Sequence, residues 1–190
     1  MGKNKRQVIV ARENDDEIAA IAVGETGRLD RIDINILDRL QEDGRLTNVR
    51  LAELVGLSPS PCLRRVKLLE DQGYIEGYHA TLNARRAGFG VTVFVHISIR
   101  QHIGKEANQF REAIKRVPEI IECHAISGGT DFLLMVISSS LDAYSELNKS
   151  VLLRLPNVSK IESAFSLDVV KKTHRLPLER LSVSEANSQP

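Results

Sequence analysis

The run Gly56-Leu57-Ser58-Pro59 constrains the fold of this chain more than any other feature. Gly56 is suited to the left-handed end of a helix, and Ser58 is a favourable N-cap for the next one. Pro59 then takes the first helical position, where its missing N–H costs no hydrogen bond. Because apolar residues recur at helical spacing on both sides, the sequence predicts two helices joined by a tight turn, the second reaching about Gln72.

A further helix is expected before this pair. Asp30 is a favourable N-cap for a helix over about 31–43, and a cap at Thr47 or Asn48 starts the next one. A supporting helix followed by two short helices and a glycine-containing turn is the helix-turn-helix pattern. We therefore expect residues 29–80 to form a helix-turn-helix domain.

The pattern changes to alternating strands and helices after Tyr74. Ile75–Leu82 is expected to be a strand or wing, and residues 81–90 a hinge. Strands are then predicted at about 91–99, 120–127, 131–138 and 158–169, and helices at about 104–117 and 141–154. This βαββαβ order predicts a ferredoxin-like domain over 91–178, so the fold class is α+β.

The third strand of that domain indicates self-association. Residues 132–137 are apolar at odd and even positions alike, so both faces of this strand are apolar. A ferredoxin-like sheet covers only one face with its own helices. A second copy of the chain is the simplest cover for the other face, so we expect a homodimer. The alternative is an ordinary central strand with a semi-exposed apolar face.

Composition and the two ends of the chain add limits. The net charge of +1 gives no global attraction to nucleic acid, so any DNA-binding surface must be local. Cys62 and Cys123 form no CxxC pair, which fits a reducing compartment, and no run is long enough for a membrane helix. We expect a cytoplasmic protein with no membrane contact, an N-terminal extension over 1–28 and a polar tail over 179–190.

The helix after Ser58 carries the candidate DNA-binding surface. Its inner side is expected to comprise Pro59, Cys62, Leu63, Val66 and Leu69, and its outer side Ser60, Arg64, Lys67 and Asp71. Residues 58–67 hold three cations and no acid, whereas 29–79 hold seven cations and nine acids. Arginine can grip guanine or phosphate, and helix N-termini can hold phosphate, although a merely solvated helix face is the alternative. The candidate DNA-binding residues are Asn48, Ser58, Ser60, Pro61, Arg64, Arg65 and Lys67.

Several segments resemble the Lrp/AsnC family, the leucine-responsive and asparagine-responsive regulators. The resemblance is carried by Leu29-Asp30-Arg31-Ile32-Asp33, by residues 55–66 around Ser58-Pro59-Ser60-Pro61-Cys62-Leu63, by Gly73–Tyr78, by Glu122-Cys123-His124 and by Leu152–Pro156. It covers roughly residues 29–178. The resemblance implies a winged helix-turn-helix head, a ferredoxin-like effector domain, dimers that often assemble into octamers, and amino-acid ligands bound between subunits.

The segment 127–131 is the candidate effector site. Its two glycines leave backbone N–H groups accessible to a carboxylate, and Asp131 suits an α-ammonium group. The residues alone favour a tight β-turn that Asp131 caps. The resemblance places the effector here and implies the candidate residues Ala125, Ser127, Gly128, Gly129, Thr130, Asp131 and Ser166. Many relatives carry an acid after the first glycine, where this chain has Gly129-Thr130, so the amino acid is left open.

No feature of the sequence indicates catalysis. The five histidines lack metal-ligand spacing, and no GxSxG, P-loop or paired-carboxylate arrangement occurs, so we expect neither an enzyme nor a resident metal or cofactor. The favoured hypothesis is a regulator that binds double-stranded DNA and senses an amino acid. The alternatives are an architectural DNA-binding protein without an effector and a regulatory module of an amino-acid enzyme.

Overall fold

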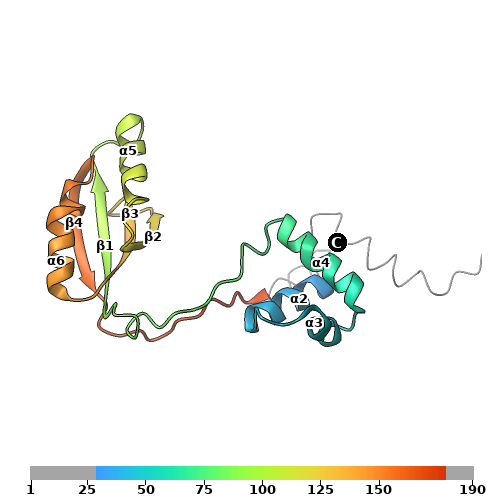
Figure 1. The fold of residues 1–190 in the computed structure, drawn as a ribbon. Coiled ribbons are helices and arrows are strands. Elements are labelled where there is room, and N and C mark those ends of the chain that lie inside the picture. Colours follow the sequence, from blue (N-terminus) through green and yellow to red (C-terminus); the bar gives the residue numbers. More distant parts are fainter. Residues whose placement is uncertain (1–28, 179–190) are drawn as a thin grey trace, which may run out of the picture. The chain divides into compact units, whose positions relative to one another are not determined.

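The computed structural model describes residues 29–178, which fall into two compact units (Figure 1). The head comprises the described residues up to Ala80 together with those from Thr173 onward, and the sheet domain comprises Thr81–Lys172. The expected hinge at 81–90 therefore groups with the sheet domain, and residues 173–178, expected in the second domain, group with the head. The predicted extension and tail lie outside the described residues.

The head is built from three helices around a small apolar core. They are α2 (Arg31–Glu42), α3 (Asn48–Val55) and α4 (Pro59–Asp71). The start of α2 is fixed by a capping box in which Asp30 and Asp33 each accept a backbone N–H of the other. Thr47 caps α3, which ends at Gly56 with φ 74°, as its left-handed geometry requires. The buried residues of the head core are Ile36, Leu37, Leu51, Ala52, Cys62, Leu69 and Leu178.

Within the described residues the segment Ile75–Leu82 does not form the expected strand: it pairs with no strand of the sheet. A strand needs a partner for its backbone groups, and the described part of the head holds no other strand. Ile75 instead packs against the head core, and the Tyr78 hydroxyl donates to Glu70 at 3.0 Å. The segment thus stays in contact with the last turn of α4.

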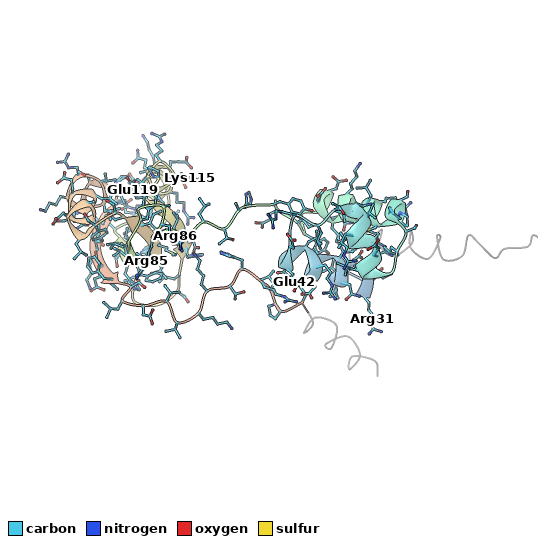
Figure 2. All side chains as sticks on the ribbon, turned by 60° about the horizontal axis from the view of Figure 1, so that its bottom comes forward. Arg31, Glu42, Arg85, Arg86, Lys115 and Glu119 are labelled. Carbon is cyan, nitrogen blue, oxygen red and sulfur yellow. The ribbon has the colours of Figure 1, made fainter. Side chains whose placement is uncertain are left out.

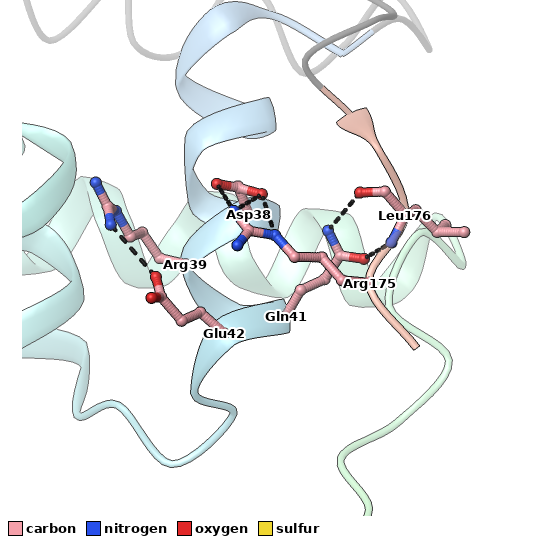
Figure 3. A network of polar contacts seen from close by, with 6 residues as sticks. All are labelled: Asp38, Arg39, Gln41, Glu42, Arg175 and Leu176. Carbon is pink, nitrogen blue, oxygen red and sulfur yellow. Dashed lines mark hydrogen bonds and ion pairs between the residues drawn. The ribbon is translucent and has the colours of Figure 1, made fainter. Parts of the chain in front are cut away.

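The segment after Lys172 is fastened to α2, as Figure 3 shows. Both carboxylate oxygens of Asp38 accept from Arg175 Nη2, at 2.8 and 2.7 Å. The Gln41 amide accepts the Leu176 N–H at 2.6 Å and donates to the Leu176 carbonyl at 3.3 Å. Leu178 then enters the head core, where it is only 8% exposed. We call residues 173–178 the C-terminal clip.

The sheet domain has the predicted βαββαβ order. Its elements are β1 (Val91–Ile99), α5 (Lys105–Ile114), β2 (Ile120–Ala125), β3 (Phe132–Ser138), α6 (Leu141–Ser150), a short 3₁₀ turn (Leu152–Arg154) and β4 (Val158–Phe165). The strands form one antiparallel sheet in the order β2-β3-β1-β4. The α+β fold class is confirmed.

One face of this sheet is covered by the helices of its own domain (Figure 1). Val93, Val95, Leu134 and Val136 are fully buried on that face with Phe110 of α5. Before β1 the chain makes a turn at 84–88 that contains Arg85 and Arg86 (Figure 2). The turn is held by Asn83, whose side chain accepts the Arg86 N–H at 3.0 Å.

The described residues contain no helix long and apolar enough to cross a membrane.

Candidate functional site

The starts of α3 and α4 are tied together by one side chain. Asn48 Nδ2 donates to the Pro59 carbonyl at 2.7 Å, so the first turns of both helices are held side by side. Ser58 and Ser60 are exposed at the start of α4, and Pro61 is half-buried. Ser58 stands at the N-cap as predicted, but its side chain makes no capping hydrogen bond. Its hydroxyl is therefore not committed to holding the helix.

Two cations of α4 remain available to a partner. Arg64 and Lys67 are exposed, and neither is in an ion pair with any residue of the described range 29–178. The arginines elsewhere on the head surface include three that pair with near neighbours, namely Arg39 with Glu42, Arg45 with Asp43, and Arg50 with Glu53. The outer side of α4 consequently presents positive charge that the head does not neutralise locally.

Arg65 corrects the expectation that it contacts DNA. It is 4% exposed, and its Nη1 lies 2.7 Å from both Asp30 Oδ2 and Asp33 Oδ1. Burial raises the pKa of the Asp33 carboxyl, although the hydrogen bond from Arg65 opposes that change. Both acids belong to the capping box of α2, so Arg65 joins α4 to the start of α2. It has a structural role within the head.

The rotation of α4 about its axis also differs from the prediction. Cys62, Arg65 and Leu69 face the core, whereas Leu63, expected to pack inward, is 45% exposed. Pro59 is exposed as well. The sequence predicts Leu63 to face inward because its helical spacing from Pro59 and Val66 matches that of a core residue, and nothing local distinguishes it from a core leucine.

The glycine hairpin connects β2 and β3 at the surface of the sheet domain. Ile126 N–H donates to the Asp131 carbonyl at 2.9 Å, which closes the loop Ser127–Thr130. Gly128 has a φ of 131°, a value that side chains rarely tolerate, and a Cβ added to Gly128 or Gly129 would meet open space. The loop thus leaves its backbone accessible.

Asp131 ties the hairpin to β1 through its side chain. Its Oδ2 accepts the Ile99 N–H at 2.8 Å, which fastens the hairpin to the end of β1. Its Oδ1 lies 3.5 Å from His102 Nδ1, and the neighbouring Thr130 Oγ1 lies 3.4 Å from His96 Nδ1. One carboxylate oxygen is therefore committed to the fold, while the other faces an exposed imidazole.

One expected effector residue, Ser166, lies apart from this loop within one chain. Ser166 N–H donates to the Thr92 carbonyl at 3.0 Å, near the start of β1, whereas Asp131 meets the end of that strand at Ile99. The two positions are roughly 20 Å apart along the strand. Ala125 ends β2 and lines a cavity of about 310 Å³ beside Phe110 and Phe132. A single copy does not bring all the candidate residues together.

The open face of the sheet carries apolar residues at its centre. Leu133, Met135 and Ile137 of β3 are half-buried on the side opposite the core, and Phe94 of β1, which pairs with Met135, is 36% exposed. β3 is therefore apolar on both faces, as its sequence indicated. Isolated exposed apolar residues are common, but a contiguous row across paired strands is typical of an interface.

Comparison with known proteins decides the family. Residues 29–76 match a winged helix-turn-helix DNA-binding model, and residues 92–176 match the Lrp/AsnC ligand binding domain. The leucine-responsive regulatory proteins of Klebsiella pneumoniae and Escherichia coli K12 are each 44% identical to this chain over 151 residues, covering 80% of it and 92% of the relative. The chain belongs to the Lrp/AsnC family of transcriptional regulators. It is a DNA-binding regulator with a ligand-binding domain and not an enzyme.

Two solved structures of transcriptional regulators agree with this assignment. A transcriptional regulator of Neisseria meningitidis, crystallised as a complex with L-methionine, superposes with a TM-score of 0.77 at 42% identity, covering 81% of this chain and 99% of that one. An AsnC family regulator of Agrobacterium tumefaciens superposes with a TM-score of 0.76 at 35% identity, covering 80% and 99%. A helical head followed by an antiparallel sheet domain is thus the architecture that this chain shares with them.

Proposed function

We propose that this Lrp/AsnC protein binds specific DNA sequences through the outer side of α4 and that an amino acid controls this binding. The observation that carries the DNA contact is the exposed pair Arg64 and Lys67, which no described acid neutralises. Arg64 is suited to a bidentate contact with guanine or a phosphate, and Lys67 to a phosphate. The DNA phosphate backbone is then approached by the helix starts, at Asn48, Ser58, Ser60 and Pro61.

The proposed effector is an amino acid held at the hairpin 127–131. The support is the L-methionine complex of the Neisseria regulator, together with a loop whose glycine backbone is accessible to a carboxylate. Asp131 Oδ1 suits the α-ammonium group, because the Ile99 N–H occupies only Oδ2, and the His102 imidazole beside Oδ1 is exposed. Ala125 and Thr130 border this loop.

The proposed assembly is a dimer formed through the open face of the sheet. Leu133, Met135 and Ile137 give that face an apolar centre, which a second copy would bury. Ser166 lies away from the hairpin in one copy, so its proposed contribution to the effector site would come from the second copy. We propose that the dimer acts in the cytoplasm and can associate further into octamers.

The test combines ligand screening with DNA selection. The full chain is heated with each of the twenty amino acids, and one of them is expected to raise the melting temperature, because a ligand at 100 times its Kd stabilises the folded state by about 2.7 kcal/mol. Duplexes selected from random DNA are then titrated with and without that amino acid, and a change in affinity is expected. DNA binding with no response to any amino acid would favour an architectural role and contradict the effector proposal.

A further inference from the structure

α4 carries an apolar side chain that does not pack into the head core. Leu63 is 45% exposed, although it stands on a helix whose other leucines, Leu68 and Leu69, are half-buried and buried. Burying a leucine side chain is favourable, but a single exposed leucine is common on protein surfaces. What distinguishes Leu63 is its position relative to the cations of α4.

Leu63 borders the outer side of α4. At 100° per residue it lies three residues after Ser60 and four before Lys67, so these three form one row along the helix. Ser60 and Lys67 are exposed, and Arg64 lies next to this row. A surface that approaches DNA with these polar residues therefore brings the isobutyl group of Leu63 to it as well.

A second exposed apolar residue lies beside the start of α4. Val49, in the first turn of α3, is 57% exposed, and the Asn48–Pro59 hydrogen bond of 2.7 Å holds that turn against the start of α4. The face formed by the two helix starts thus combines hydroxyl, cationic and aliphatic groups. In the major groove the only aliphatic group is the C5-methyl of thymine.

We infer that Leu63 is a specificity-determining residue that contacts a thymine methyl group in the major groove. The inference rests on the proposed placement of the outer side of α4 against DNA, and it adds a base that this side reads. Arg64 and Lys67 supply charge and guanine or phosphate contacts, whereas Leu63 distinguishes thymine from cytosine by the methyl group alone. A second copy's head packed on Leu63 is the competing occupant.

Replacement of thymine by uracil tests this directly, because it removes the methyl group and leaves base pairing unchanged. A duplex selected from random DNA by the wild-type protein is prepared once with thymine and once with uracil. Wild type should bind the uracil duplex about fourfold more weakly for each methyl group contacted, the factor for about 0.8 kcal/mol of buried methyl. Leu63→Ala should bind the two duplexes equally.

Leu54→Ala is the matched control, because Leu54 is 37% exposed on α3 and lies outside α4. It should keep the wild-type preference for thymine. If wild type binds both duplexes equally, the thymine contact is wrong while DNA binding itself stands. If Leu63→Ala weakens binding to both duplexes and keeps their ratio, Leu63 acts elsewhere, as a contact between heads would require, and the inference is overturned.

Discussion

Loss of the Arg65 side chain should open the head, whereas loss of its neighbour Arg64 should not. Arg65→Ala leaves the carboxylates of Asp30 and Asp33 without the Nη1 that contacts each at 2.7 Å. Breaking a buried ion pair by removing one partner costs about 3–5 kcal/mol. That is a large share of the stability of a small domain, so the head of this variant should be partly unfolded at ordinary temperature.

Cys62 provides the assay. It is fully buried in the head core, and burial raises the pKa of its thiol, so a thiol reagent reaches it only when the head opens. In a Cys123→Ser background, the reagent should label Cys62 of Arg65→Ala at a rate roughly 10²–10⁴ times that of the parent. This range corresponds to about 3–5 kcal/mol at tenfold per 1.36 kcal/mol.

The control and the refutation both use the same reaction. Arg64→Ala alters the next residue of the same helix, where the side chain is exposed, and should leave the labelling rate within a few fold. Asp33→Ala added to Arg65→Ala should recover part of the loss, because it removes one uncompensated charge. Labelling of Arg65→Ala at the parent rate would show that the buried pair does not hold the head together.

Three further results are expected. Leu178→Ala should destabilise the head by about 2–5 kcal/mol, because Leu178 is 8% exposed in the head core. Arg175→Ala should cost under about 1 kcal/mol, because the Arg175–Asp38 ion pair lies at the surface. Equal rates of Cys62 labelling in the two variants would contradict this. Burial, with a smaller effect from Glu70, raises the pKa of Tyr78 to about 12. Between about pH 10 and 12 the unfolded chain loses this proton and the folded state keeps it, so the stability of the head should fall as the pH rises. Tyr78→Phe should reduce this pH dependence in denaturant titrations. Asp131→Ala should weaken stabilisation by the amino acid while DNA affinity is kept, and normal ligand affinity would refute its role.

Most of the architecture could be predicted because it rests on local chemistry. Asp30, Thr47 and Gly56 end or begin helices through contacts within a few residues, and the alternation in 91–99 directly gives a half-buried strand. Such features are legible in a sequence without knowledge of the fold. The order of elements then fixed the domain type.

The errors occurred where distant residues determine the outcome. Arg65 points inward because it donates hydrogen bonds to two acids that lie 32 and 35 residues earlier. With Arg65 facing the core, the rotation of α4 about its axis turns Leu63 away from it. The C-terminal clip depends on Asp38 and Gln41, which lie more than 130 residues before it. Pairings over such separations leave no local pattern in a single sequence.

The most direct test of the account is the affinity of Arg64→Ala for a selected duplex at one fixed salt concentration. Cys62 labelling first establishes that the head remains closed. The account predicts a loss of about 1–3 kcal/mol, roughly 5–150-fold in Kd, because Arg64 is exposed and neutralised by no described acid. Wild-type affinity in a variant with a closed head would contradict the claim that the outer side of α4 binds DNA.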